Sequence, residues 1–280
     1  MRRKRNIIIT IIVAVALLLL ILSALDARLR VVPYTVSDAR IITPVRLLLI
    51  TDLHSCQYGE NQQTLLDAID SQNPDLILLG GDLFDIELPN DNTATVLSYI
   101  AERYPCCFVA GNHEYAREDT ENLFRFLDKL RIPILHGDCE TITVGSTKLN
   151  ICGVSDPNAP IIDPDMPQIE EQLQAASEQK EAGAFTVLLA HRPDLISVYR
   201  NYGFDLILCG HAHGGQFRIP GILNGLFTPG EQWFPSYAGG AYQVENTTMI
   251  VSRGLARESS ALPRIWNRPE LVVIDLIGTE

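Results

Sequence analysis

The sequence predicts an α/β protein with two packed mixed β-sheets flanked by helices, preceded by a transmembrane helix. Five short apolar runs, each ending in Asp, Asn or His, predict the sheets: RLLLITDLH (46–54), LILLGGD (76–82), CCFVAGNHE (106–114), TVLLAHRPD (186–194) and LILCGHAH (206–213). Continuous apolar runs of this length are typical of strands buried on both faces. Segments with helical periodicity lie between several of them, as expected when helices cover the sheets.

The N-terminus is a separate element. Nineteen uncharged positions, 7–25, follow four basic residues at 2–5, and only Thr10 and Ser23 among them are polar. At about 1.5 Å per residue, a helix of this length crosses the roughly 30 Å hydrocarbon core of a bilayer. A cleaved signal peptide is the alternative, but its apolar region is typically about 7–15 residues long and small residues precede its cleavage point. We therefore predict a retained anchor.

Three regions follow: a cytoplasmic basic tip with the transmembrane anchor over residues 1–25, a juxtamembrane segment over 26–45 and the main domain over 46–280. Basic residues favour the cytoplasmic side of membrane helices, which predicts a single-pass cell-membrane protein with its domain outside the cytoplasm. Without the four basic residues of the tip, 18 of the 22 Lys and Arg remain against 34 Asp and Glu, a net charge of −16. Such a body repels phosphate backbones, so nucleic acid is not an expected partner.

The remaining elements have weaker signals. Apolar stripes at helical spacing predict helices near 65–69, 123–130 and 169–176. The stretch ETITVGSTKLNICGV (140–154) alternates around Gly145–Ser146, which predicts a hairpin. Two further strands are expected in TTMIVSRG (247–254) and ELVVIDL (270–276).

The six cysteines are sparse and show no C-x-x-C spacing. Neither a zinc ribbon nor a dense disulfide framework follows from them. A domain outside the cytoplasm permits a disulfide, but the sequence indicates no pair.

Polar side chains gather at the ends of the five apolar runs. They are Asp52, His54, Asp82, Asn112, His113, His191, His211 and His213. A single His beside an apolar run is usually a core residue with a satisfied hydrogen bond, but five of the six histidines share this position. Because ligands collect where the carboxyl ends of strands meet, we expect one shared site.

The donor types at this site indicate metal. Imidazole, carboxylate and carboxamide together suit borderline divalent ions such as manganese, iron or zinc, and the thiolates of a structural zinc site are missing. Even seven of these eight side chains are too many ligands for one tetrahedral ion. They fit two ions that share a carboxylate, about 3.5–4 Å apart, an arrangement suited to phosphoryl displacement.

The motifs DLH, GDLFD, GNHE, a lone His after a strand and GHAH, in this order over about residues 46–214, resemble those of the calcineurin-like metallophosphoesterases. The anchor, GHAHGGQ, SRG and LPRIWNRPEL are similar to the membrane-associated bacterial branch related to UDP-2,3-diacylglucosamine pyrophosphatases. The resemblance implies a metallophosphoesterase-like sandwich. It also implies a membrane-anchored dinuclear enzyme that hydrolyses phosphate ester or pyrophosphate bonds, including those of an amphiphilic or lipid-linked substrate.

The resemblance further implies a role for each residue of the site. The first ion would be held by Asp52, His54 and His213. The second ion would be held by Asn112, His191 and His211. Asp82 would bridge the two ions, and His113 would act on the substrate by stabilising or protonating the leaving oxygen.

Three alternatives stay open. The substrate could be the lipid A precursor UDP-2,3-diacylglucosamine, although that nucleotide lipid is made in the cytoplasm and the domain is expected outside. The chain could be a non-catalytic metal-binding protein on the same fold, although such proteins typically lose part of the ligand set and none is missing here. A metal-dependent peptidase is disfavoured because the sequence has no H-E-x-x-H helix.

Four further features have two interpretations each, and His136 has one. Asp85 and Glu114 are candidates for hydrogen bonds to ligand histidines, or are solvated or structural carboxylates. Arg253 contacts a substrate phosphate or pairs with a carboxylate, while His136 is expected to be structural. The segment 216–240 is apolar but broken by Pro and Gly; it forms either an apolar lip over the metal site or a loop that packs its own small core.

Overall fold

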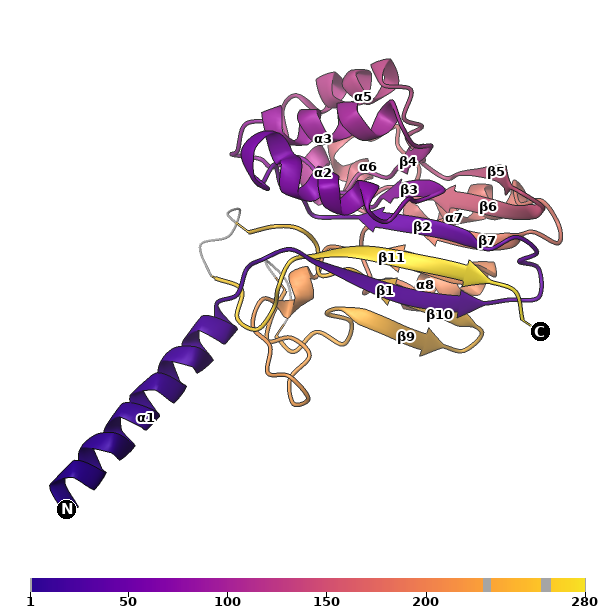
Figure 1. Ribbon diagram of the computed structural model, residues 1–280. Coiled ribbons are helices and arrows are strands. Elements are labelled where there is room, and N and C mark those ends of the chain that lie inside the picture. The colour runs from indigo at the N-terminus through magenta and orange to yellow at the C-terminus, as the bar shows by residue number, and fades with distance from the viewer. Residues whose placement is uncertain (1, 229–232, 258–262, 280) are drawn as a thin grey trace.

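Two stacked β-sheets form the centre of the molecule (Figure 1). The computed structural model describes residues 2–228, 233–257 and 263–279. The first sheet contains, in spatial order, β1 (Arg30–Ser37), β11 (Glu270–Ile277), β2 (Val45–Ile50), β3 (Leu76–Leu79) and β4 (Cys106–Phe108). The second contains β5 (Asp138–Val144), β6 (Thr147–Gly153), β7 (Phe185–Leu189), β8 (Leu206–Cys209), β10 (Thr247–Val251) and β9 (Gly240–Val244).

The core between the sheets explains the continuous apolar runs. In β2, β3, β7 and β8, alternate side chains enter the space between the two sheets, where Leu47, Leu78, Val187 and Leu208 pack in one apolar cluster. Their neighbours along each strand face outward and pack beneath helices. Both faces of these strands are therefore buried, as predicted, and β2, β3 and β4 run parallel.

Helices cover the outer face of each sheet. The apolar stripes of α2 (Gln63–Asp70), α3 (Asp91–Ala101) and α5 (Thr120–Lys129) pack on the first sheet. Those of α7 (Ile169–Glu178) and α8 (Ile196–Tyr199) pack on the second. The short helices are α4 (Asn112–Tyr115), α6 (Ala159–Ile162), and the 3₁₀ turns η1 (Glu60–Gln62), η2 (Arg200–Tyr202) and η3 (His213–Gly215). The predicted class, two mixed sheets flanked by helices, is confirmed.

Three elements had no clear sequence signal. Helix α3 begins in the polar stretch DNTAT, which hides its short stripe of Val96, Leu97 and Ile100. Strands β1 and β9 lie at the edges of their sheets, so their side chains alternate between half-buried and exposed positions. Strand β1 lies inside the segment expected to link the anchor to the domain, and it pairs with β11 along its whole length.

The predicted hairpin is formed by β5 and β6 around Gly145–Ser146. Cys139 and Cys152 face each other across it and form a disulfide. No sequence spacing could indicate this pair, because its two members meet only once the hairpin register is set.

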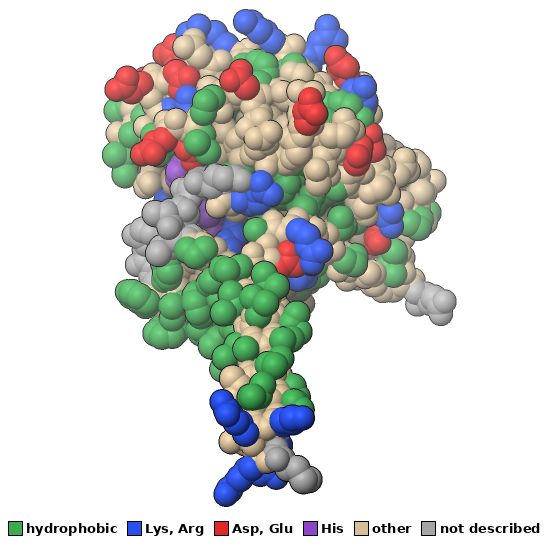
Figure 2. Space-filling model, turned by 60° about the vertical axis from the view of Figure 1, so that its left-hand side comes forward, with side chains coloured by type: hydrophobic (Ala, Val, Ile, Leu, Met, Phe, Trp, Pro, Cys, Tyr) green, Lys and Arg blue, Asp and Glu red, His purple; other side chains and the backbone are tan. Residues whose placement is uncertain are grey.

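Helix α1 (Arg2–Ala24) extends away from the body (Figure 1). None of its residues is buried, and it is long and apolar enough to cross a membrane. Its C-terminal end touches the body, since the main-chain N–H of Trp266 donates a hydrogen bond to the carbonyl of Ala24 at 2.7 Å. Residues 25–29 then lead directly into β1. Figure 2 shows hydrophobic side chains gathered at the end of the body from which α1 extends.

Candidate metal centre

The eight residues expected at the site all follow the carboxyl ends of strands, and both sheets contribute. They are Asp52 and His54 after β2, Asp82 after β3, Asn112 and His113 after β4, His191 after β7, and His211 and His213 after β8. All but Asn112 and His113, which are half-buried, are buried. The structure therefore brings the predicted set together at one edge of the two sheets.

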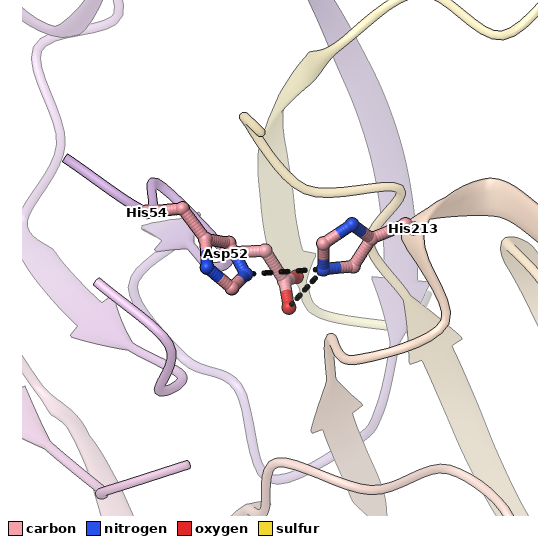
Figure 3. A group of neighbouring side chains, drawn as sticks. All are labelled: Asp52, His54 and His213. Carbon is pink, nitrogen blue, oxygen red and sulfur yellow. Dashed lines mark hydrogen bonds and ion pairs between the residues drawn. The ribbon is translucent and has the colours of Figure 1, made fainter. Parts of the chain in front are cut away.

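The first group is Asp52, His54 and His213 (Figure 3). The Nε2 atoms of His54 and His213 lie 3.2 Å apart. His213 Nε2 also lies 3.5 Å from Asp52 Oδ1. Figure 3 shows the two imidazoles converging on the carboxylate from different loops, which is the arrangement expected of ligands to one ion.

The second group is Asp82, His191 and His211. His191 Nε2 lies 3.1 Å from Asp82 Oδ2 and 3.2 Å from His211 Nδ1. The same Asp82 oxygen lies 3.7 Å from His54 Nε2 in the first group. One carboxylate thus stands between the two groups, as the expected bridging role requires.

Asn112 and His113 occupy the first turn of α4. The main-chain N–H of His113 donates to Asp82 Oδ1 at 2.8 Å, which fixes this turn against the centre. The His113 ring lies 4.3 Å from the ring of His54, centroid to centroid. Its side chain is 27% exposed, against 2% for that of His54. His113 is therefore placed beside the two groups and is more open to solvent.

The backbone of the centre is unusual. Five of the eight residues have a positive φ, between 45° and 64°: Asp52, His54, Asp82, His211 and His213. Such left-handed conformations cost a non-glycine residue about 1 kcal/mol or more, and they cluster at functional sites. The strand ends therefore turn sharply to aim their side chains inward.

Glycines let the backbone approach both central carboxylates. A Cβ on Gly111 would overlap Asp82 Oδ1, and one on Gly210 would lie 2.5 Å from Asp52 Oδ2. Gly254 closes on Asp52 from the other side, with a built Cβ 2.5 Å from the Cβ of Asp52. These carboxylates are consequently walled in by main chain.

Asp85 and Glu114, the two carboxylates with two interpretations each, differ in role. Asp85 Oδ2 lies 3.2 Å from His54 Nδ1, so it does contact a histidine of the centre. Glu114 does not. It is fully buried and accepts hydrogen bonds from the main-chain N–H groups of Asp82, Leu83, Phe84 and Gly111 at 2.8–3.1 Å. Glu114 therefore ties the loop after β3 to the loop after β4.

We expect Glu114→Gln to destabilise the fold and loosen the centre. The amide would turn an NH2 group toward main-chain donors, and each buried group left unpaired costs about 1–3 kcal/mol. Thermal unfolding measured without added metal should show a lowered Tm. Glu121→Gln on the exposed face of α5 removes the same charge and should leave the Tm unchanged; an equal loss in both variants would contradict this role.

The other two uncertain residues have structural contacts. Arg253 Nε lies 3.5 Å from Glu270 Oε2, which favours the carboxylate-pairing interpretation. The expected structural role of His136 agrees with its contacts, since its Nδ1 lies 2.6 Å from Ser155 Oγ. Neither residue belongs to the two groups of the centre.

One buried ion pair beside the centre was not predicted from the sequence. Arg192 Nε donates to Asp156 Oδ2 at 2.6 Å, and Arg192 Nη1 lies 3.4 Å from His211 Nε2. The signal was present in HRPD, where an Arg directly follows the lone His. A charged side chain buried at a strand end needs a partner, and that partner, Asp156, is remote in sequence.

The electrostatics favour ionised carboxylates. Burial opposes ionisation of Asp82, but His191 outweighs it, so the pKa of Asp82 lies well below its ordinary value. Burial likewise opposes ionisation of Asp52, and His213 reverses the effect, lowering the pKa of Asp52. For His191, burial is outweighed by Asp82, which raises its pKa to about 10. Both central carboxylates are thus held ionised, as ligands to divalent cations must be.

The residues fit divalent metal. His191 Nδ1 donates to the carbonyl of Gly80 at 2.9 Å, which directs Nε2 toward Asp82; Asp85 orients His54 in the same way. Such contacts are typical around metal-binding histidines. Within the described residues, Asp52 Oδ2 and Asn112 Oδ1 are buried without a hydrogen-bond partner. Orphaned buried oxygens beside imidazole nitrogens are what a cation would satisfy.

The chain is similar to known proteins over most of its length. The calcineurin-like phosphoesterase model matches residues 45–215. "Phosphodiesterase YaeI" of Escherichia coli (strain K12) is 30% identical over 241 residues, covering 84% of this chain and 83% of that protein. A "Transmembrane protein with metallophosphoesterase domain" of Bos taurus is 29% identical over 83% of this chain. The chain spans about half the length of that relative and of several others.

Solved structures agree with the fold. A 5′-nucleotidase precursor from Thermus thermophilus matches with a TM-score of 0.52 and 17% identity, covering 84% of this chain and 54% of that one. The protein TT1561 of the same organism matches with a TM-score of 0.52 and 13% identity, covering 76% of this chain and 91% of that one. With the family model, the relatives and the clustered ligand types in agreement, the chain belongs to the calcineurin-like phosphoesterase family of metal-dependent phosphoester hydrolases.

Proposed function

We propose that the protein is a membrane-anchored phosphodiesterase with two divalent metal ions, bound as the resemblance implies. The first ion's ligands are Asp52, His54 and His213, the second ion's are Asn112, His191 and His211, and Asp82 is shared. The observation that carries the proposal is the position of Asp82 Oδ2, 3.1 Å from His191 Nε2 and 3.7 Å from His54 Nε2. When bound, such a metal pair lowers the pKa of a coordinated water and offsets charge on phosphoryl oxygens.

The protein's own side chains complete the chemistry. His113 stands at the open side of the centre, where its ring can donate a proton to a leaving oxygen. Burial lowers the pKa of His113, which makes it a stronger acid once protonated. Asp85 Oδ2 lies 3.9 Å from His113 Nδ1, beyond hydrogen-bond distance, so Asp85 acts on this ring through its charge alone.

A diester is the favoured substrate class. A pocket of about 160 Å³ opens beside His211, between Pro193–Asp194 and Pro235–Tyr237. It offers room for a second substituent on the phosphate. The printed name of the Escherichia coli relative, a phosphodiesterase, supports the same class.

The test is turnover by the purified full chain in detergent. After chelation, manganese, iron or zinc is added back singly, and bis(p-nitrophenyl) phosphate is compared with p-nitrophenyl phosphate. We expect metal-dependent hydrolysis with preference for the diester. Binding of metal without hydrolysis of any phosphoester would favour a non-catalytic metal-binding protein instead.

The anchor is α1, and we propose that the body lies outside the cytoplasm. The basic residues at positions 2–5 support this orientation. The Cys139–Cys152 disulfide supports it independently, because disulfides persist mainly in oxidising compartments. The membrane-protein relatives agree with an anchored chain.

The proposed orientation predicts that a cysteine near the C-terminus can be labelled from outside the cell. In a Thr279→Cys variant, whose new thiol lies at an exposed position near the C-terminus, a membrane-impermeant maleimide should react on intact cells. The unsubstituted chain provides the background, because its cysteines are buried or paired. Labelling only after lysis would place the body in the cytoplasm and favour the nucleotide lipid UDP-2,3-diacylglucosamine as substrate.

The segment 216–240 supports an amphiphilic substrate. In its described part, Ile222, Trp233 and Phe234 are 84%, 71% and 65% exposed, while Phe227 packs its ring on Trp233. Part of the loop thus packs on itself, and part presents apolar surface to solvent. Residues 229–232 lie outside the described structure.

Replacing Phe234 by Ser should separate lipid-like from small substrates. Inserting a Phe side chain into apolar surroundings stabilises by about 1.5–3 kcal/mol, so hydrolysis of a vesicle-held phosphodiester should fall at least about tenfold. Hydrolysis of bis(p-nitrophenyl) phosphate should change little. Ile42→Ser, at an exposed apolar residue outside this segment, is the control, and equal losses on both substrates would contradict the apolar-lip interpretation.

A further inference from the structure

A second pocket lies at the base of α1, on the body. It has a volume of about 540 Å³, and we call it the arginine pocket after Arg30, Arg218 and Arg253. Its other principal lining residues are Ile219, Ile222 and Trp266. It shares no lining residue with the candidate metal centre.

Positive charge in the arginine pocket is incompletely balanced. Glu270 is the one carboxylate of the described residues that pairs with it, and its Oε2 lies 3.8 Å from Arg30 Nε and 3.5 Å from Arg253 Nε. Neither distance makes a hydrogen bond. Arg253 Nε and Glu270 Oε2 are both buried without a hydrogen-bond partner within the described structure. The three guanidinium groups of the pocket therefore have one carboxylate among them, which leaves a net positive charge.

Among the contacts that the structure describes, the hydrogen-bond partners of Arg218 are all neutral. It donates to the carbonyl of Gly214 at 3.0 Å and to the side-chain oxygen of Asn224. Burial and the neighbouring Arg253 lower its pKa to about 10, so Arg218 still carries a charge at neutral pH. Guanidinium groups suit phosphate oxygens in both charge and geometry, and an anion would supply what the arginine pocket lacks.

The position of the arginine pocket identifies the source of that anion. Trp266 lines it and donates its main-chain N–H to Ala24 at the end of α1. When α1 spans a bilayer, this end lies at the headgroup level, where Trp side chains are enriched. Ile222 projects from the rim, and Figure 2 shows apolar side chains around the same end of the body.

We propose that the arginine pocket binds the phosphate of an anionic membrane phospholipid, with Ile219 and Ile222 against the acyl chains. The proposal rests on α1 as the anchor but not on the phosphoesterase reaction. A body with a net charge of −16 is otherwise repelled by an anionic surface. The arginine pocket would overcome this repulsion locally and seat the body in one orientation on the membrane.

Fluorescence quenching tests the proposal. The full chain carries two tryptophans, so Trp233→Phe leaves Trp266 as the reporter inside the arginine pocket. This chain is reconstituted in phosphatidylcholine vesicles that contain equal mole fractions of brominated phosphatidylglycerol or brominated phosphatidylcholine. We expect the anionic lipid to quench Trp266 at least about fivefold more strongly, as basic contacts with anionic headgroups would produce.

Matched variants decide the source of the effect. Arg30→Gln with Arg218→Gln should equalise quenching by the two lipids, whereas Arg28→Gln with Arg268→Gln removes the same charge outside the pocket and should not. Arg30→Gln alone, at a half-buried position, should reduce the preference even if the buried Arg218 proves necessary for folding. Equal quenching in the parent chain, a preference that survives Arg30→Gln, or an equal loss in the Arg28/Arg268 pair would overturn the proposal. Quenching by neither lipid would overturn the anchor as well, and turnover of soluble diesters would still report on the catalytic proposal.

Discussion

Replacing Asp82 by alanine is expected to strip metal from the protein and abolish turnover together. Asp82 Oδ2 faces histidines of both groups, and Asp82 Oδ1 accepts the main-chain N–H of His113. Without the carboxylate, two cations would repel each other with less negative charge between them. We expect metal affinity to fall by more than the 10–100-fold typical when a residue behind a ligand is lost.

Metal content by mass spectrometry and turnover of a phosphodiester measure this effect. Asp85→Asn is the matched control, because Asp85 lies on the same loop but His54 is the one assigned ligand that its side chain contacts. It should lower affinity by about 10–100-fold. If the Asp82→Ala protein retained both ions, the shared-carboxylate assignment would be wrong.

His113→Ala is expected to behave differently, keeping its metal while losing most of its activity. All seven assigned ligands remain in this variant. Turnover should nevertheless fall by about 10² to 10⁴, the usual contribution of a positioned acid. The loss should be smaller for nitrophenyl esters than for alkyl esters, because a nitrophenolate leaves without needing a proton.

Kinetics with a series of leaving groups, together with metal analysis, separate the two outcomes. A variant that lost its metal would show that His113 is a ligand or supports one. Unchanged turnover of alkyl esters would show that another group supplies the proton. Tyr115→Phe, three residues from Asn112 on α4, tests whether disturbance of the helix alone produces the effect.

The fold was largely predictable because buried strands leave a strong pattern. Runs such as LLLI in β2 are apolar at each position, because one face of the strand packs against the other sheet and the opposite face packs against helices. Edge strands lack that constraint. In β1, Val31 and Pro33 face solvent while Tyr34 packs inward, so the strand resembles a linker in sequence.

The sequence was enough to predict which residues form the candidate site, but not which contacts hold those residues in place. Polar residues at strand ends are visible in a sequence, because each interrupts an apolar run. The role of Glu114 is not, since its four partners are main-chain N–H groups from two loops that meet only in the folded state. The positive φ angles of residues such as Asp52 and His213 could not be predicted either, because Asp and His indicate a left-handed conformation much less clearly than glycine does.

The short connection between α1 and β1 limits the distance between the membrane and the catalytic centre. Five residues separate Ala24 from Arg30, and a fully extended chain of that length reaches only about 20 Å. An anchored protein would therefore carry its catalytic centre at a nearly fixed level, and its encounters with membrane-borne phosphodiesters would become a search in two dimensions. Lengthening residues 25–29 with a flexible insert would dilute that advantage for membrane substrates while leaving soluble ones untouched.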